Sequence, residues 1–527
     1  MELTCGGCGS QGKIARLIFT ALKEPISTRK QAACWPIVLP VGLAVALLTY
    51  KLSSIAGLHR DEAAFGLFAE SILAGARPLT GFFNDYTAPL HSYLVAASFA
   101  LLGESTFALR IGGVLCNLAA LGLYYAIVRR LWPKAALSAL WLLATFPLFV
   151  VFSRISGENY ALNPLLLCGG IWAYLRASAA ASPRQAGAWW LISGLLFGLG
   201  CWNHVVALPT VASVVVVYLA CARPPWTLLR RGGLWVWGGV LLAALPKLYL
   251  IIFNHASWLP EVKGPTERLP FLNAWANLVY TLGGDALYAR ATGQVAFSLN
   301  GLLPLAMLLS AAALLLARPA GAAERRLGRG LLAVFVLSAL GSWLITPAYL
   351  VGSRIWLLPL WFVPAILAAG MSTWPAMVRR TVVTVLVGGN LFALGYDYFY
   401  TFQKTGGAVQ TQVNVGGRTD NSTDFVDFTP LAEKLRRVPG QPAIYVEDYR
   451  PYRLWFLLPE ARERIHVIDQ TAPTPWSFPP GSLLAVFRAP DTGDLADGEE
   501  MKVGGVPVKY RADLSTANQV VLQVLAK

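Results

Sequence analysis

Gly57-Leu-His-Arg-Asp61-Glu62-Ala-Ala-Phe65 closes the first long apolar run of the chain, and the fold is best read outward from this stretch. Two adjacent carboxylates directly after a membrane-length apolar run need a reason, because ionisable groups at a bilayer commonly mark a functional site. A structural alternative is that the acids cap the next helix, since negative charges favour a helix N-terminus. The stretch therefore predicts a change from a membrane span to a surface helix that carries two acids.

The composition indicates a polytopic membrane protein. The 527 residues are 56% hydrophobic and only 13% charged, whereas soluble domains carry about 25% charged residues. A spanning helix needs about 20 mainly apolar residues, and runs of this kind predict about eleven spans. They are residues 35–55, 106–128, 134–152, 159–177, 188–203, 205–222, 234–253, 296–317, 330–347, 355–374 and 380–398.

The basic residues predict the orientation of these spans. The net charge of +15 comes from short clusters between apolar runs and not from a basic stripe, so nucleic acid is not an expected partner. Lys and Arg are enriched in cytoplasmic loops. With the N-terminus inside, the inner loops are the basic ones, at 129–134, 176–184, 223–231, 318–329 and 379–380. The outer loops are then 56–105, 153–158, 254–295 and 348–354.

Three parts of the chain are expected. Residues 1–34 are basic and lack an apolar core, which predicts a cytoplasmic leader and not a cleavable signal peptide. Residues 35–398 are the transmembrane domain, and its first outer loop, 56–105, contains two short apolar stretches suited to interfacial helices. Residues 399–527 predict a small extracytoplasmic α/β domain, and this part includes a polar, Gly-rich linker at 403–422. Its expected elements are helices at 427–437 and 449–458 and strands at 443–447, 464–468 and 483–488.

Short motifs accompany the acidic pair in a fixed order. They are Gly75-x-x-Pro78, Pro89-Leu-x-x-Tyr93, Gly103-Glu-Ser-Thr-Phe-Ala-Leu-Arg110, Ser153-Arg-Ile-Ser-Gly-Glu158-Asn159 and Ser353-Arg354-Ile-Trp-Leu-Leu-Pro359. This order resembles glycosyltransferase family 39, a group of membrane glycosyltransferases with the GT-C fold. The group includes protein O-mannosyltransferases, the lipid A aminoarabinose transferase and galacturonosyl transferases of lipopolysaccharide. The resemblance covers roughly residues 35–180 and returns at 353–364.

The resemblance implies an enzyme of the cell envelope that moves a sugar from a polyprenyl-phosphate donor to a lipid, glycan or protein acceptor on the outer face. Such an enzyme must orient the donor and remove a proton from an acceptor hydroxyl. Asp61 is the candidate base, and Glu62 either supports the base from behind or accepts a hydrogen bond from a sugar hydroxyl. Glu158 lies where the family places another acid, and it is a candidate for binding sugar hydroxyls, an amine or a divalent cation.

Arginines are the candidates for the departing phosphate, because the guanidinium matches two phosphate oxygens at once. Arg110 and Arg354 are the candidates. The alternative for Arg110 is a side chain that reaches the interface from a helix start. The alternative for Arg354 is a structural pair with an acid of an outer loop.

Four further residues of the first outer loop are candidates for substrate binding: His59, Asp85, Tyr86 and Tyr93. Asp85 is also explained as a turn residue, because Asn-Asp is common in turns. No metal site is predicted, although a divalent cation remains an alternative. Cys5 and Cys8 have the spacing of half a zinc site, and the chain offers no second pair at a matching spacing.

Two functions without glycosyl transfer stay open from the sequence. A transporter or lipid flippase requires ionisable residues deep inside spans, and Lys247 beside Pro246 is the notable candidate. The other is a non-catalytic scaffold among membrane lipids that presents the C-terminal domain to a partner. It gives no reason for one face to be shared by Asp61-Glu62, Arg110, Glu158 and Arg354. The enzyme differs from both of these alternatives in one structural requirement, because only the enzyme needs these groups around a single site.

Overall fold

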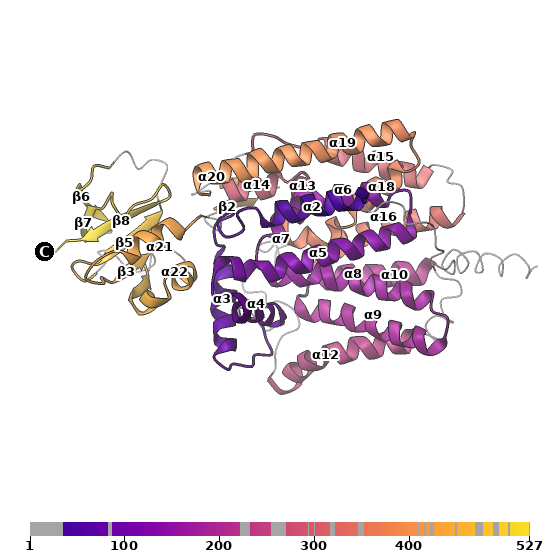
Figure 1. Cartoon of the computed structure of the whole chain (residues 1–527), viewed down its shortest axis with the longest axis horizontal. Coiled ribbons are helices and arrows are strands. Elements are labelled where there is room, and N and C mark those ends of the chain that lie inside the picture. Colours follow the sequence, from indigo (N-terminus) through magenta and orange to yellow (C-terminus); the bar gives the residue numbers. More distant parts are fainter. Residues whose placement is uncertain are drawn as a thin grey trace, which may run out of the picture.

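The computed structural model is mainly helical, with a bundle of long helices and a separate sheet near the C-terminus (Figure 1). Its helices and strands follow the apolar patterns of the sequence closely. The structure describes residues 35–82, 87–221, 232–254, 270–292, 295–299, 301–316, 322–345, 353–407, 412–415, 418–421, 426–447, 451–468, 478–487, 495–503 and 506–525.

Every predicted span coincides with helical structure. The helices are α2 (Trp35–Thr49), α5 (Thr106–Leu131), α6 (Ala136–Ala144), α7 (Pro147–Ser153), α8 (Glu158–Ser178), α9 (Pro183–Asn203), α10 (Ala207–Cys221), α12 (Leu234–Asn254), α15 (Leu302–Leu316), α16 (Ala322–Ile345), α17 (Leu357–Leu360), α18 (Val363–Met371) and α19 (Ala376–Ala393). The π-helix η4 (Leu394–Tyr400) and α20 (Thr401–Thr405) continue α19 without a break.

Length and composition alone qualify four helices of the described residues to cross a membrane. They are α5, α12, Arg326–Ile345 of α16, and Ala376–Thr405 from α19 to α20. The pair α6–α7 is a fifth if it counts as one span, and it bends by 54°. Pro147 opens α7 at this bend, where a missing N–H interrupts helical hydrogen bonding. The chain is therefore a multi-pass membrane protein.

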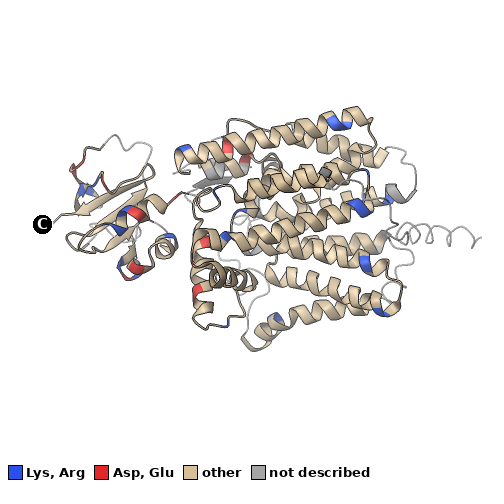
Figure 2. Cartoon of the chain, viewed as in Figure 1, with Lys and Arg blue, Asp and Glu red and all other residues tan. Residues whose placement is uncertain are grey.

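Charged side chains are unevenly distributed over the bundle. Figure 2 shows most basic residues of the helical part at the end far from the C-terminal sheet, with acidic residues on α3 at the near end. Arg129 and Arg130 lie in the last turn of α5, and Arg176 lies in the last turn of α8. This arrangement is the one that the predicted orientation requires.

Two surface helices lie at the end of the bundle nearest the sheet, α3 (Arg60–Leu73) and α4 (Leu90–Leu102) (Figure 1). They correspond to the predicted interfacial stretches and pack against each other. The outer segment 254–295 is more ordered than expected, because α13 (Phe271–Gly283) and α14 (Asp285–Thr292) form within it. The buried Leu278 and Leu282 give α13 an apolar face that the sequence analysis overlooked.

The C-terminal part contains a six-stranded mixed sheet with the order β4-β3-β5-β8-β7-β6. The predicted strands form β3 (Ile444–Val446), β4 (Ile465–Val467) and β5 (Leu483–Phe487), which pair in parallel, and the predicted helices form α21 (Thr429–Arg436) and α22 (Tyr452–Leu457). Three antiparallel strands were not expected: β6 (Glu500–Val503), β7 (Val506–Tyr510) and β8 (Gln519–Val524). A hairpin of β1 (Gln412–Val415) and β2 (Arg418–Asn421) also lies within the predicted linker.

The C-terminal part contacts the bundle through α22, which packs on α3. The ring of Phe456 lies against Gly66 and stacks on Phe99 at 6.1 Å between ring centroids. Arg462 forms an ion pair with Glu70 of α3 at 2.7 Å. The sheet is thereby held beside the helix that begins with the acidic pair.

Candidate active site at the start of α3

The start of α3 is fixed by a reciprocal cap. His59 precedes the helix, and its Nδ1 accepts a hydrogen bond from the backbone N–H of Asp61 at 3.0 Å. In return, the backbone N–H of His59 donates to Oε2 of Glu62 at 3.0 Å. This capping box satisfies backbone donors that a helix start otherwise leaves unpaired. Glu62 therefore caps the helix, as the structural alternative for the acids proposes, and His59 is the other residue of the capping box.

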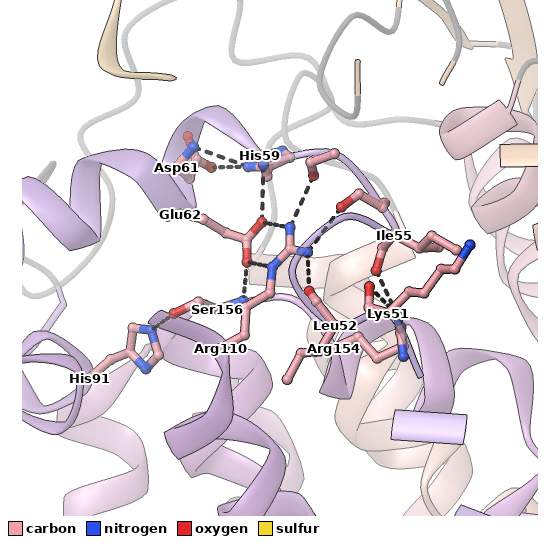
Figure 3. A network of polar contacts seen from close by, with 12 residues as sticks. Lys51, Leu52, Ile55, His59, Asp61, Glu62, His91, Arg110, Arg154 and Ser156 are labelled. Atoms are coloured by element: carbon pink, nitrogen blue, oxygen red, sulfur yellow. Dashed lines mark hydrogen bonds and ion pairs between the residues drawn. The ribbon is translucent and has the colours of Figure 1, made fainter. Parts of the chain in front are cut away.

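Glu62 is completely buried and is saturated with hydrogen bonds (Figure 3). Its Oε2 lies 2.7 Å from Nη2 of Arg110, and its Oε1 lies 2.9 Å from Nε of the same guanidinium. The backbone N–H of Ser156 donates to Oε1, and that of His59 donates to Oε2. A carboxylate that already accepts four hydrogen bonds is a structural anion and not an open site for substrate.

Arg110 uses all five of its N–H groups within the protein (Figure 3). Besides the fork on Glu62, Nη1 donates to the carbonyls of Leu52 and Ala56 at 2.8 and 2.9 Å. Nη2 donates to the carbonyl of Gly57 at 3.0 Å. In this arrangement no N–H of Arg110 is left for a donor phosphate, which differs from the role that the sequence predicts. The guanidinium instead holds the loop that leads into α3.

Asp61 lies in a different environment from its neighbour. Its side chain is 31% exposed, and its carboxylate oxygens lie 3.9 Å from Nδ1 of His59 and 3.9 Å from Nε of Arg60. The pair thus divides into a buried acid that builds the site and a solvent-accessible acid beside two nitrogen groups. Of the two, only Asp61 meets the requirement that a general base reach its substrate.

A second buried arginine, which the sequence analysis did not single out, holds the same loop from the other side. Arg154 is fully buried, and its guanidinium donates five hydrogen bonds to backbone carbonyls. The acceptors are Leu47, Leu48, Tyr50, Lys51 and Ile55. An arginine directly after an apolar run was the available signal. We name residues 50–59, between α2 and α3, the entry loop.

His91 and Ser156 connect α4 to the buried pair. Nε2 of His91 lies 2.8 Å from Oγ of Ser156, whose backbone N–H is bound to Glu62. Burial lowers the pKa of His91 to about 3, because the charged imidazolium loses its hydration. His91 is therefore neutral in the folded protein at physiological pH. His91 is not among the residues that the sequence analysis assigns to the site.

Several outer segments meet at this end of the bundle. Glu158 begins α8 two residues after Ser156, so its backbone lies on the same side as Asp61; its side chain is outside the described residues. Thr87 forms an antiparallel bridge with His204, and the backbone N–H of Ala88 donates to the carbonyl of Asn203. The turn between α9 and α10 thus joins the first outer segment.

The structure describes some of the remaining candidate side chains and not others. Tyr93 is half-buried on α4, and its hydroxyl donates to the carbonyl of Pro78 at 3.2 Å. Asp85 and Tyr86 lie outside the described residues. Arg354 is part of the short helix η3 (Ser353–Trp356), and its side chain is outside the described residues. Among the residues that the structure describes, no three His, Cys, Asp or Glu side chains gather as metal ligands.

Asp427, which precedes α21, is a further acid near the site. Burial raises the pKa of its carboxyl, and a hydrogen bond from Thr429 and the charge of Arg110 act in the opposite direction. The influence of Arg110 places this acid within electrostatic range of the buried pair, although 317 residues separate the two in sequence (427 − 110). The C-terminal part thus contributes a titratable group to the surroundings of the acidic pair.

Comparisons with known proteins identify the fold of the chain. Residues 86–251 match the model of the dolichyl-phosphate-mannose-protein mannosyltransferase family. ArnT from Cupriavidus metallidurans in the apo state superposes with a TM-score of 0.57 at 15% identity, covering 93% of this chain and 98% of that chain. The chain has the GT-C fold. None of the curated proteins searched matches the sequence.

A second structure of the same ArnT also matches nearly the whole chain. That structure is bound to undecaprenyl phosphate, and it superposes with a TM-score of 0.56 at 15% identity over 94% of this chain and 99% of that chain. The match includes the C-terminal part as well as the bundle, since so little of either chain is left out. At this identity the likeness establishes the fold and leaves the chemistry to the residues of the site.

Proposed function

We propose that this GT-C protein transfers a sugar from a polyprenyl-phosphate donor to an acceptor at the outer face of the membrane. The observation that carries the proposal is the division of the acidic pair, in which Glu62 is buried on Arg110 and Asp61 stays accessible at a helix start. ArnT, which shares the fold, has been captured with undecaprenyl phosphate, a lipid of this donor class. The dolichyl-phosphate-mannose family match points to the same donor class.

Asp61 is the base in this proposal. It accepts the proton of the acceptor hydroxyl while the acceptor oxygen attacks the anomeric carbon and the bond to the lipid phosphate breaks. Glu62 and Arg110 do not touch substrate; they fix the entry loop and the first turn of α3, and so the position of Asp61. The departing phosphate needs a cation, and Arg354 remains the candidate because the N–H groups of Arg110 are occupied.

Glu158 is proposed to bind the sugar or the acceptor from the start of α8. Its position two residues beyond Ser156 brings it to the same end of the bundle as the base. The proposal covers a hexose or a pentose as the sugar and a lipid, glycan or protein as the acceptor. These identities are what the following experiment measures.

The decisive experiment compares envelope lipids, glycans and proteins from a deletion strain with those from the wild type by mass spectrometry. We expect the loss of one sugar unit from one class of molecule, and its return when the wild-type chain is supplied. The Asp61→Asn variant, expressed at the same level, is expected not to restore it. Restoration by Asp61→Asn removes the assignment of the base, and an unchanged envelope in the deletion strain contradicts the proposed function.

A further inference from the structure

A groove lies between the end of α2 and η4, and neither Asp61 nor Glu62 is among the residues that line it. It has a volume of about 500 Å³ and is lined by Ala46, Leu47 and Tyr50 at the end of α2 and by Gly395, Phe399 and Tyr400 of η4. This volume lies in the range of about 300–1,000 Å³ that is typical of ligand sites. One wall belongs to the candidate membrane span Ala376–Thr405, and the lining residues Tyr50 and Tyr400 are exposed, so we expect the groove to open to the bilayer. We name it the lateral groove.

The lateral groove is apolar along its length and polar at one end. Gln403 also lines it, and Oε1 of Gln403 accepts a hydrogen bond from Nζ of Lys51 at 3.0 Å. Nε2 of Gln403 donates to the hydroxyl of Tyr50 at 3.3 Å. Tyr50 and Tyr400 are both exposed, and tyrosine is enriched at the headgroup level of membranes. The polar end therefore coincides with the level of the lipid headgroups.

Two cations give this end a positive charge. Nζ of Lys51 is exposed, and the guanidinium of Arg154 lies 5.0 Å from the centroid of the Phe399 ring that lines the groove. Arg154 is bound to carbonyls and has no acidic partner among the described residues. The lining contains no acid, and Asp397 of η4 is buried, accepting hydrogen bonds from the backbone N–H groups of Ala296 and Phe297.

We propose that the lateral groove binds an anionic glycerophospholipid. Its phosphate lies at Lys51 and the hydroxyl of Tyr50, and one acyl chain lies along Leu47 and Phe399. A glycerophospholipid is favoured over the sugar donor because neither Asp61 nor any other acid is among the residues that line the groove. This inference does not depend on the proposed function.

Lipid retention by the purified full-length chain tests the proposal. The protein is reconstituted in nanodiscs of phosphatidylcholine alone or of phosphatidylcholine and phosphatidylglycerol in equal parts, and native mass spectrometry counts the lipids that remain bound after release. We expect the wild type to retain phosphatidylglycerol about fivefold better than phosphatidylcholine, the preference expected of one cation at a headgroup. Lys51→Glu is expected to abolish this preference.

Filling the groove provides an independent variant. A Cβ at Gly395 meets no atom within 4 Å, so Gly395→Leu projects into the groove without a backbone clash. It is expected to lose the retained lipid whatever its headgroup. Gly388→Leu on α19 is the matched control, because a Cβ at Gly388 also meets no atom within 4 Å and Gly388 does not line the groove. The control is expected to retain lipid like the wild type.

Three results overturn the proposal. One is equal retention of the two phospholipids by the wild type. Another is retention of phosphatidylglycerol by both Lys51→Glu and Gly395→Leu at the wild-type level. The third is retention of added undecaprenyl phosphate with no retention of phosphatidylglycerol, which assigns the groove to a prenyl lipid. Because Lys51 is exposed and Lys51→Glu is expected to fold, its result stands even if Gly395→Leu is unstable.

Discussion

Asp61 and Glu62 are neighbours in sequence with different physical roles. The side chain of Glu62 is completely buried on Arg110, whereas that of Asp61 is 31% exposed. Burial of an ion pair is tolerated only when the remaining hydrogen-bonding groups are satisfied, as they are here. The two residues are therefore expected to respond differently to the loss of their charges.

The variant Asp61→Asn is expected to fold and to lose activity. An amide cannot accept the proton of the acceptor hydroxyl, and removal of a general base typically costs about 10²–10⁴ in rate. Turnover of a polyprenyl-phosphate sugar by purified protein measures the effect, with the thermal midpoint as the control for folding. Turnover within about threefold of the wild type contradicts the assignment, since that is far below the cost of losing a base.

The variant Glu62→Gln is expected to destabilise the protein strongly. It leaves Arg110 as an uncompensated buried charge, and breaking one partner of a buried pair costs about 3–5 kcal/mol. Thermal unfolding of the solubilised protein measures the loss, and Asp61→Asn is the matched control on the adjacent position. An unchanged midpoint for Glu62→Gln removes the structural role given to this acid.

His91 makes stability depend on pH. Its folded pKa of about 3 lies below the ordinary value of 6.5, so the unfolded chain binds a proton that the folded chain does not bind. Its contribution to stability is complete above pH 6.5 and is lost as the pH falls toward 3; the loss between pH 7 and 5 is about 2 kcal/mol. His91→Gln is expected to flatten the fall of the thermal midpoint between pH 7 and 5. A slope equal to that of the wild type excludes this role.

At the scale of elements, the entry loop is the decisive segment. It has no regular hydrogen-bonding ladder of its own, and two guanidiniums, from α5 and the α7–α8 turn, donate hydrogen bonds to its carbonyls. Backbone groups in a buried loop must be paired, and an arginine pairs several at once. The loop in turn positions α3 and Asp61.

The variant Arg154→Lys is expected to loosen the entry loop without removing its charge. A lysine ammonium has three donors on a flexible stem and cannot reproduce a planar fork that serves five carbonyls. We expect a lower thermal midpoint and faster hydrogen exchange in residues 50–59. Arg176→Lys, at the last turn of α8, is the control and is expected to leave both unchanged. Wild-type exchange in Arg154→Lys contradicts the proposed support.

At the scale of the whole molecule, the C-terminal part is docked on the helix that carries the proposed base. Phe456 fills the space beside Gly66, and Arg462 pairs with Glu70. Asp427 also lies close enough to Arg110 for the two charges to interact. The sheet is thus connected to the site through α3, and changes in its docking are expected to reach Asp61.

The variant Gly66→Leu is expected to displace α22 from α3. A Cβ at Gly66 lies 2.5 Å from the ring of Phe456, which is buried and stacked on Phe99 and has little room to move. We expect faster release of the C-terminal part by a protease and reduced turnover. The double variant Gly66→Leu/Phe456→Ala is expected to recover part of both losses. Gly122→Leu on α5, where a Cβ meets nothing within 4 Å, is the control.

The sequence by itself determined the membrane class, the positions of the spans, the interfacial helices and the first three paired strands of the sheet. These features depend on the length and period of local apolar runs, which a single sequence displays directly. The strands β6 to β8 were missed because their apolar runs are short and interrupted by polar residues such as Lys502, Lys509 and Gln523, although β6 and β7 are neighbours in the chain. The helical architecture of the membrane domain was predicted because it too depends on the length of local apolar runs.

Only the tertiary structure decided which acid of the pair is buried and what Arg110 does. Glu62 meets Arg110 across 48 residues and Ser156 across 94, and the carbonyls of the entry loop are 53 to 58 residues from Arg110. Composition and spacing do not show which groups meet over such separations, because that depends on how α3, α5 and the α7–α8 turn pack. Burial then separates the two acids: the saturated carboxylate of Glu62 holds the loop before α3, and the carboxylate of Asp61 stays accessible, as the proposed base requires.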